Sequence, residues 1–315
     1  MIIASSPRKL HSMGVLGINS RNINYVMRYN PRYLYPLVDD KLETKEAALK
    51  AGINVPKLYS VIKFNYQLKT LGDLLDTYQK VAIKPAHGSG GKGIMVLKGK
   101  VGKLYRKPND ELVDLNTIKH YISNILSGMY SISGLTDKAF LEYGIQFDPF
   151  FNNICFKGVP DIRIVVFRGV PITAMARLPT LKSNGKANLH QGAIGVGVNI
   201  STGLTTYGVF SNQVTKVHPD THYSIHGLEI PNWQKIIEIA VKCADTVGLG
   251  YLGVDIVLDQ TLGPLMLELN ARPGLSVQIA NQQGLQKSLE YIDRLEYLPK
   301  DPQARIELGR NLAKK

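Results

Sequence analysis

The sequence is poor in cysteine, in acidic residues and in long apolar runs, and each shortage excludes a class of protein. Its two cysteines, Cys155 and Cys243, stand far apart and form no CxxC pair, which excludes a disulfide framework and a thiolate metal site. No apolar run approaches the roughly 20 residues that span a bilayer, and the first residues lack the apolar core of a secretory signal. We therefore expect a globular, cytoplasmic protein without membrane insertion.

Acidic residues number 25 against 38 lysines and arginines in 315 residues, so the net charge is +13. Such an excess suits an anionic partner, which could be a nucleotide phosphate, a polyanion or an acidic metabolite. The densest basic run, residues 98–107, contains Tyr105 as its one aromatic residue and lies in no known RNA- or DNA-binding pattern. We interpret it as a solvated hairpin face and expect no specific nucleic-acid partner.

Residues 253–275, GVDIVLDQTLGPLMLELNARPGL, predict a hairpin that carries oxygen ligands. Two apolar runs flank a turn rich in Asp, Gly and Pro, and Glu268 and Asn270 face the same side because strand side chains alternate. A buried ionised carboxylate needs a partner or a metal, so two carboxylates beside a carboxamide indicate a hard cation such as Mg²⁺. A pair of edge-strand acids facing water is the alternative. The candidate metal ligands are Asp255, Glu268 and Asn270.

A glycine-rich loop at residues 88–93 lies between two predicted strands in KPAHGSGGKGIMVL. The loop matches GxGxxG, but a dinucleotide fingerprint opens a helix, and a Walker A loop needs Ser or Thr after Lys92. A protein kinase places its lysine after the loop, whereas Lys84 comes before it. We predict a loop whose N–H groups cover phosphates, with a plain glycine-rich hairpin as the alternative. The candidate phosphate ligands are Lys84, Gly88, Ser89, Gly90, Gly91, Lys92 and Gly93.

Two further segments offer nucleotide contacts. A helix is predicted from Asp40, its N-cap, to Gly52, and a cation in its first turn, Lys41, opposes the helix dipole unless a phosphate lies nearby. The strand AFLEYGI leads into a linker, so its end either forms a hinge that reads an adenine edge or is an ordinary buried strand. The hinge candidates are Glu142, Tyr143, Gly144 and Ile145.

The stretch DIRIVVFRGVPITAMARL predicts two strands around Gly169 with charges among apolar neighbours. Asp161 is a candidate for ribose hydroxyls, and Arg163 and Arg177 for phosphoryl oxygens, which a guanidinium binds bidentately. A surface stripe of charge is the alternative. The following residues, 181–198, are too rich in Gly, Asn and Ser for a core element, so we predict a substrate loop that includes Asn188 and His190.

The remaining sequence predicts scaffold. Residues 1–39 are expected to be irregular, and helices are expected near residues 70–78, 116–127 and 232–247 and after Pro273. The second of these is capped by Asp114 or Asn116. His218, His222 and His226 have metal-ligand spacing for a helix, but Pro219 argues against a helix there. We predict divisions at 1–39, 40–145 and 146–315.

Six of these stretches together resemble the ATP-grasp superfamily, and within it the RimK-like alpha-L-glutamate ligase-related proteins of the sugar-transfer-associated type. They are DDKLETK, VAIKPAHGSGGKGI, LEYGI, PDIRI, KANLHQGA and GVDIVLDQTLGPLMLELNARPG, which span residues 39–275. The resemblance implies an α+β fold in which two subdomains clamp ATP. It implies Lys41 and Lys84 on the phosphates, the 88–93 loop as a lid, residues 142–145 at the adenine and Asp161 at the ribose. It also implies Mg²⁺, with Mn²⁺ as a substitute, on Asp255, Glu268 and Asn270.

The chain departs from related carboxylate ligases in two places. Those proteins carry a full amino-terminal α/β domain where this chain has a short segment. The D-alanine ligase branch has an arginine that stabilises the intermediate at the position of Gly253, so that task falls here to Arg163, Arg177 or Arg272.

The function expected from these features is an ATP-dependent carboxylate–amine ligase that forms ADP and phosphate through an acyl phosphate. Its substrates would be small-molecule or peptide carboxylates and amines, with glutamate as a candidate, and association with a second copy stays open. Two alternatives remain: a small-molecule kinase of the same fold, and a basic polyanion-binding protein with a vestigial nucleotide site.

Overall fold

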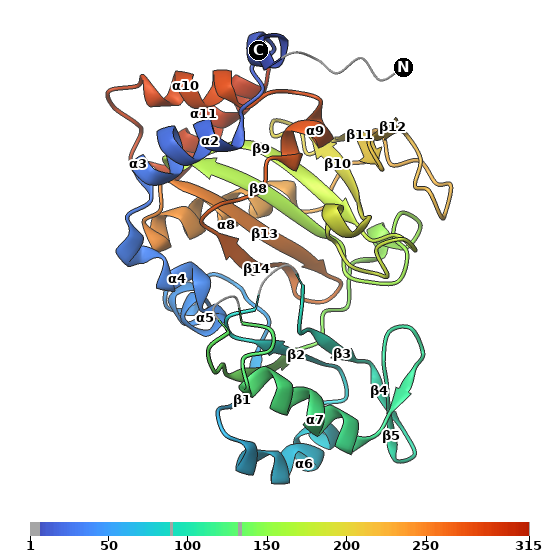
Figure 1. Ribbon diagram of the computed structural model, residues 1–315. Coiled ribbons are helices and arrows are strands. Elements are labelled where there is room, and N and C mark those ends of the chain that lie inside the picture. Colours follow the sequence, from blue (N-terminus) through green and yellow to red (C-terminus); the bar gives the residue numbers. More distant parts are fainter. Residues whose placement is uncertain (1–6, 89–90, 132–133, 315) are drawn as a thin grey trace. The chain divides into compact units, whose positions relative to one another are not determined.

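A computed structural model of the chain describes residues 7–88, 91–131 and 134–314. The chain divides into two compact units. Unit 1 comprises Met1–Asp39, Glu43–Asn54 and Phe147–Lys315, and unit 2 comprises Asp40–Leu42 and Val55–Gln146. All strand pairs described are antiparallel, and helices pack against the sheets, as expected for an α+β protein (Figure 1).

Unit 1 is built around a seven-stranded sheet in the described part of the chain, with the order β12-β11-β10-β9-β8-β13-β14. Its strands are β8 (Asp161–Phe167), β9 (Val170–Leu178), β10 (Ile194–Val198), β11 (Thr205–Phe210), β12 (Gln213–Thr215), β13 (Tyr251–Asp259) and β14 (Gly263–Asn270). The two predicted hairpins, β8–β9 and β13–β14, are confirmed and lie side by side through the pairing of β8 with β13.

Helices cover both faces of this sheet. α8 (Trp233–Val247), which ends at the left-handed Gly248 as predicted, contacts β8, β9, β13 and β14. α9 (Ser276–Asn281) and α10 (Gln286–Asp293) pack with the N-terminal segment on the other face, around Val165, Phe167 and Tyr251 (Figure 1). α11 (Pro302–Ala313) contacts β9 and α8. The helical tail predicted after Pro273 is therefore confirmed.

The N-terminal segment is largely helical, so the prediction of an irregular segment is wrong. Its elements are α1 (Pro7–Ser12), α2 (Ile18–Ser20), a π-helical turn η1 (Arg21–Val26), α3 (Met27–Tyr29), η2 (Arg32–Leu34) and α4 (Pro36–Asp39). Pro31 does stop a helix, but it lies beyond α3 and leaves residues 18–29 helical. Tyr25 and Val26 pack into the core. Asn30 bonds to both backbone groups of Tyr251 and to the carbonyl of Ala271, at 2.8–2.9 Å.

The glycine-rich stretch 194–198 is a buried central strand, β10, so the prediction that residues 181–198 contain no core element is wrong there. The reason is close packing. A Cβ at Gly197 would lie 2.4 Å from Thr206 Oγ1 and 2.7 Å from the carbonyl oxygen of Ala280, and one at Gly195 would lie 2.6 Å from Leu189 Cδ2. These glycines let neighbouring elements approach the strand rather than forming a loop.

Unit 2 contains a four-stranded sheet, β1-β7-β2-β3, and a small sheet, β4-β5-β6. The strands are β1 (Leu58–Ile62), β2 (Val81–Pro85), β3 (Met95–Leu97), β4 (Gly99–Val101), β5 (Leu104–Arg106), β6 (Leu112–Val113) and β7 (Ala139–Tyr143). The described part of unit 2 also contains the helices η3 (Asn65–Thr70), α6 (Leu71–Thr77) and α7 (Leu115–Leu126). Asp114 caps α7 by accepting from Thr117 N at 2.7 Å. The strand, glycine loop, strand prediction is confirmed by β2 and β3.

Core and surface follow the sequence pattern. Ile83 and Leu141 of the sheet pack with Ile118 and Ile122 of α7. The basic run 98–107 forms the β4–β5 hairpin, whose lysines and Arg106 are largely exposed.

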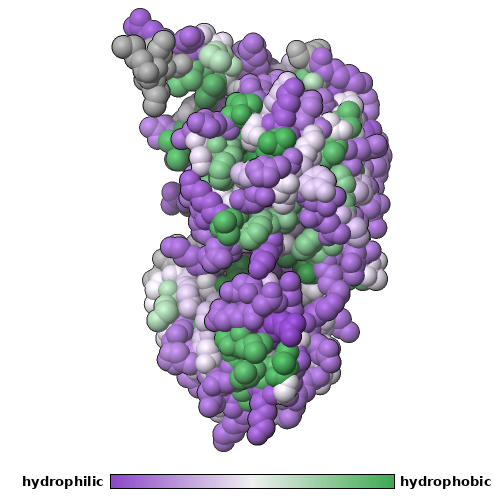
Figure 2. All heavy atoms as spheres, turned by 90° about the vertical axis from the view of Figure 1, so that its right-hand side faces the viewer, coloured by the Kyte–Doolittle hydropathy of each residue, from purple (hydrophilic) through white to green (hydrophobic). Residues whose placement is uncertain are grey.

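One face of the molecule is mainly hydrophilic with hydrophobic patches (Figure 2). Within the described residues, no helix is long and apolar enough to cross a bilayer. Cys155 and Cys243 are free, and burial raises the pKa of both thiols to about 12.

Candidate functional site

The register of four strands places six predicted site residues on one face of the unit 1 sheet. Directly paired residues share a face, and the pairs here are Asp161 with Arg177, Arg163 with Asp255, and Asp255 with Glu268. Asn270 lies two residues beyond Glu268 and therefore on the same face. Alternation sets the face of each residue within its strand, and the strand pairing brings these charges together.

These side chains form a buried network that we call the acid–arginine cluster: Asp161, Arg163, Arg177, Asp255 and Asn270. Arg163 donates two hydrogen bonds to the carboxylate of Asp255, both at 2.7 Å. Arg177 donates to Asp161 at 2.5 and 2.6 Å and also to Asp255 Oδ2 at 2.8 Å. Asn270 Nδ2 lies 3.3 Å from the same oxygen of Asp255. Asp255 is 1% exposed, so its charge depends on these partners.

The two carboxylates of the cluster differ in acidity. Burial opposes the ionisation of Asp255, but Arg163 and Arg177 outweigh it and lower the pKa of this carboxyl to about 2. Burial raises the pKa of Asp161 to about 6, with Arg177 opposing the rise and the charge of Asp255 adding to it. Because the two carboxylates lie close together on Arg177, the charge of one opposes the ionisation of the other, and Asp255 is the stronger acid.

The chemistry of the donors in and beside the cluster fits a hard cation. Asp255, Glu268 and Asn270 offer carboxylate and carboxamide oxygens, the ligands that Mg²⁺ prefers, and Glu268 is partly exposed beside the buried Asp255. Within the described residues no group of three or more His, Cys, Asp and Glu side chains is arranged to hold a metal. The predicted set has two carboxylates and one amide, and its assignment to a metal stays a prediction.

Gly253, the position expected to leave stabilisation of the intermediate to an arginine elsewhere, has no room for a larger side chain. A Cβ there would lie 2.6 Å from Pro273 Cβ. Arg163 and Arg177, two of the candidates for that task, lie in the cluster, whereas the third, Arg272, stacks over the ring of Tyr35 at 5.2 Å. Sequence reasoning missed Arg21, which is buried and donates to the carbonyl of Pro273 at 2.7 Å. Its place in a segment without a recognisable motif gave no signal.

The predicted substrate residues Asn188 and His190 lie at a short turn, η5 (Leu189–Gln191). Asn188 Oδ1 accepts from the N–H of His190 at 3.0 Å. Leu189 packs over Gly195, which pairs with Arg177, so the turn lies over the same sheet face as the cluster. His218 is buried and its Nε2 lies 3.0 Å from the carbonyl of Pro179, which fits a scaffold role.

In unit 2, the predicted phosphate ligand Lys84 pairs with a predicted hinge residue. Lys84 Nζ lies 2.5 Å from Glu142 Oε1, and the side chains are 11% and 3% exposed. The register of β2 and β7 places both on the sheet face opposite Ile83 and Leu141, which point into the core. The pair neutralises two charges that are costly to bury separately.

Lys41 and the glycine loop lie near the end of β2. Lys41 begins α5 (Lys41–Lys50), and its Nζ donates to the carbonyl of Gly88. Gly91 and Gly93 have φ of +72° and +74°, which favours glycine, and Lys92 is exposed. Ser89 and Gly90 lie outside the described residues.

Two N–H groups of the predicted adenine hinge already have partners within unit 2. Tyr143 N donates to the carbonyl of Lys57 at 2.9 Å, and Gly144 N donates to that of Lys80 at 3.1 Å. Glu142 uses its side chain for Lys84. An adenine contact from this stretch would therefore fall to its carbonyl groups or to Ile145.

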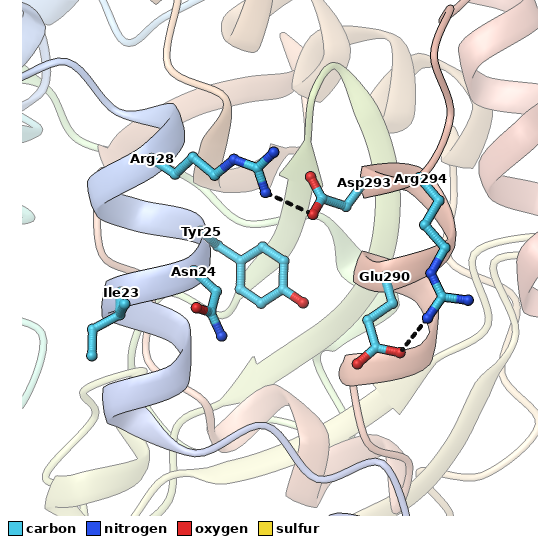
Figure 3. Close-up of a pocket in the computed structure, with 7 residues that line it drawn as sticks. All are labelled: Ile23, Asn24, Tyr25, Arg28, Glu290, Asp293 and Arg294. Carbon is cyan, nitrogen blue, oxygen red and sulfur yellow. Dashed lines mark hydrogen bonds and ion pairs between the residues drawn. The ribbon is translucent and has the colours of Figure 1, made fainter.

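A cavity of about 370 Å³ lies between the N-terminal segment and α10, away from the predicted residues (Figure 3). Its charges pair with each other, Arg28 with Asp293 at 3.0 Å and Arg294 with Glu290 at 3.7 Å. Tyr25 points into it, and burial raises the pKa of this phenol to about 12. None of the predicted site residues lines it, and the Arg28–Asp293 pair joins the N-terminal segment to α10.

Comparison with known proteins identifies the fold. The model of a family described as "Sugar-transfer associated ATP-grasp" matches residues 20–294. This match bears out the predicted fold and the sugar-transfer-associated type, while the RimK-like subtype stays a prediction. No curated protein matches the sequence.

Solved structures with a similar fold include the ATP-grasp ligase PsnB complexed with a minimal precursor. It has 13% identity and a TM-score of 0.44, and the match covers 84% of this chain and 63% of that one. D-alanine–D-alanine ligase from Bacillus anthracis with ATP has 12% identity, coverage of 88% and 68%, and a TM-score of 0.46. Biotin carboxylase from Campylobacter jejuni has 14% identity and a TM-score of 0.49, and the match covers 86% of this chain and 49% of that one. The chain thus spans less than two thirds of the PsnB chain.

Proposed function

Because the chain belongs to the sugar-transfer associated ATP-grasp family, we propose that it is an ATP-dependent ligase that joins a carboxylate to an amine. The observation that carries this proposal is the acid–arginine cluster. It combines oxygen donors suited to Mg²⁺ with two guanidinium groups on one sheet face, and it adjoins Glu268. Phosphoryl transfer needs this combination of a metal with fixed positive charge.

In this proposal, Asp255, Glu268 and Asn270 hold the metal. The bound Mg²⁺ would neutralise negative charge on the ATP phosphates. Asp255 already has two arginine partners and an amide, so taking a metal ligand role requires it to share or exchange one of them. An arginine released in this way is free to bind the transferring phosphoryl group bidentately.

Unit 2 supplies the remaining phosphate contacts in this proposal. Lys41, Lys84 and the N–H groups of residues 88–93 are the proposed ligands of the terminal phosphates. Lys84 exchanges Glu142 for phosphate, and because the Glu142 side chain is buried, its carboxylate then requires a new partner. The carbonyls of residues 142–145 face the adenine, and Asp161 is retained as a ribose contact.

The proposed chemistry has two steps. An oxygen of the substrate carboxylate attacks the γ-phosphorus, the bond from that phosphorus to the β,γ-bridging oxygen breaks, and ADP leaves. The amine nitrogen then attacks the acyl carbon, phosphate departs with the carboxylate oxygen, and the amine proton passes to solvent. Arg163 and Arg177 hold charge on the phosphoryl oxygens, and no protein nucleophile is needed.

The acid substrate is proposed to be an amino acid or a peptide carboxylate, with glutamate as the first candidate. The support is the positive charge of Arg163 and Arg177 and the position of the η5 turn over the same sheet face. Asn188 and His190 on that turn are the proposed substrate contacts.

The test is a screen of amino acids and short peptides, alone and in pairs, with ATP and Mg²⁺. If the protein is a ligase, ADP and free phosphate should form only with both the carboxylate and the amine present. A hydroxamate should form when hydroxylamine replaces the amine. ADP with a phosphorylated product and no free phosphate would identify a kinase instead. AMP and pyrophosphate would contradict attack at the γ-phosphate. Heparin or DNA that suppresses ATP turnover would favour the polyanion-binding alternative.

A further inference from the structure

A cluster around two buried carboxylates in unit 2 lies beside the proposed phosphate contacts and has no part in the chemistry above, and its histidine side chain is 41% exposed. Its centre is His87, whose Nδ1 lies 2.7 Å from Asp137 Oδ1 and whose Nε2 lies 3.5 Å from Asp40 Oδ2. The side chains of Asp40 and Asp137 are 6% and 0% exposed, so both carboxylates need partners inside the fold. Lys138 also belongs to the cluster, with its Nζ 3.4 Å from Asp40 Oδ2.

Three separate stretches of chain meet at this histidine. Asp40 precedes Lys41, His87 precedes Gly88, and Asp137 precedes β7. Backbone bonds join the same stretches: Lys41 N donates to Ala86 O at 3.0 Å, and Ala86 N donates to Lys138 O at 2.9 Å. The N–H of His87 also donates to Asp137 Oδ2 at 3.0 Å.

We infer that His87 is a positioning residue for nucleotide binding: it fixes Lys41 and Gly88 relative to each other by facing Asp40 with one ring nitrogen and Asp137 with the other. The inference rests on the proposed function, because Lys41 and Gly88 are proposed phosphate contacts. The histidine ring places one nitrogen toward each carboxylate, whereas an amide side chain reaches only one of these positions. Lys41 also donates to Gly88 O, so its ammonium already lies at the start of the loop.

The same residue types also bind metals, but Asp40, His87 and Asp137 do not form a metal-binding group among the described residues. The contact of Lys138 with Asp40 fits an ionic cluster as well. Asp40 has a second task, since its Oδ1 accepts from Leu42 N at 2.8 Å at the start of α5. Replacing Asp40 would therefore disturb the helix as well, and His87 is the better residue to vary.

The test compares His87→Ala, His87→Asn and His87→Gln with His120→Ala, an exposed histidine on α7 in the same unit. Asn places its donor where Nδ1 was, near Asp137, and Gln extends toward Asp40. Amide hydrogen exchange of nucleotide-free protein at residues 40–42 and 86–88, thermal unfolding and the Kd for Mg·AMPPNP are measured for each.

We expect His87→Ala to speed exchange at both sites and to raise the Kd about tenfold, the size of one lost hydrogen bond. His87→Asn should keep the unfolding temperature but not the affinity, His87→Gln should recover part of the affinity, and His120→Ala should change neither. In a Lys41→Ala background the further loss from His87→Ala should disappear, because the histidine acts through that lysine.

Three results would overturn the inference. One is a His87→Ala variant with the exchange rates and Kd of His120→Ala. Another is faster exchange with an unchanged Kd, and the third is a full additional loss in the Lys41→Ala background. If the unmodified protein binds no AMPPNP, the proposed function fails and the inference falls with it, whereas normal binding that His87→Ala leaves intact removes the inference alone.

Discussion

The two charged regions of this protein are organised in opposite ways. In unit 1, the acid–arginine cluster lies on neighbouring strands, so alternation and register place every member. In unit 2, Lys84 and Glu142 also lie on strands, but Lys41 and His87 come from a helix start and a strand end that meet through tertiary contacts. A charge on a sheet is therefore positioned by its strand, whereas a charge at the end of an element needs additional contacts to fix it.

Both regions have their buried charges paired. Asp255 has Arg163 and Arg177, and Lys84 has Glu142. A ligand that takes one member must therefore leave the other with a new partner, because an isolated buried charge is costly.

The largest effect is expected for Glu268→Ala in unit 1. The loss of a metal ligand should lower Mg²⁺-dependent ATP turnover by at least about a hundredfold, since even residues that only orient ligands contribute about ten- to a hundredfold. The unfolding temperature should change little because Glu268 is partly exposed. Turnover and thermal unfolding are measured together, and unchanged turnover would remove Glu268 from the metal site.

Arg177→Met tests the pairing within the same cluster. It leaves Asp161 and Asp255 buried with one cation fewer, so the free energy of unfolding should fall by about 3–5 kcal/mol. Urea unfolding measures the change, with Arg272→Met as the control because Arg272 is exposed and stacks on Tyr35. Equal, small changes in both variants would show that the cluster does not depend on Arg177.

Lys84→Met makes the corresponding change in unit 2. Affinity for ATP should fall about ten- to a hundredfold, because a charge-assisted hydrogen bond contributes about 1.5–3 kcal/mol. The variant also removes Lys84 from the buried carboxylate of Glu142. Lys84→Met with Glu142→Gln should therefore recover stability but not affinity. A double variant that recovers ATP affinity would assign Lys84 to the fold alone.

The smallest effect is the pH dependence of unfolding. Asp255 has a folded pKa of about 2, below the unfolded value of about 3.9, so its contribution is present above pH 4 and is lost as pH falls toward 2. Asp161 has a folded pKa of about 6, above its unfolded value, so stability falls as pH rises from about 4 to 6. Asp161→Asn should remove this second decrease in the free energy of unfolding, which is of order 1–3 kcal/mol. Urea unfolding at a series of pH values measures it. An identical slope in the variant would contradict the raised pKa.

The sequence predicted the strands and their charged faces well because period-two alternation is a local signal. It predicted β13 and β14 and the shared face of Glu268 and Asn270 correctly. It failed at Ile194–Val198, where composition suggested a loop, because the packing of Ala280 and Thr206 that requires glycine comes from distant sequence.

Other failures have the same cause. The helical residues 18–29 are stabilised by burial of Tyr25 and Val26, which local propensity does not show. The ion pairs could not be predicted either. The residues around Asp255 in the sequence do not indicate that Arg163 and Arg177 bind its carboxylate, and those around His87 do not indicate its contacts with Asp40 and Asp137. Residue types were predictable from sequence, whereas their partners depended on contacts between distant segments.

The most direct test of the central claim, that the charged region of each unit contributes to nucleotide binding, is calorimetric titration of Mg·AMPPNP into the unmodified protein, Lys84→Met with Glu142→Gln, and Glu268→Ala. We predict binding that requires Mg²⁺ in the unmodified protein and is weakened about tenfold or more by the change in either unit. Mg²⁺-independent binding of equal strength in all three proteins would contradict the account.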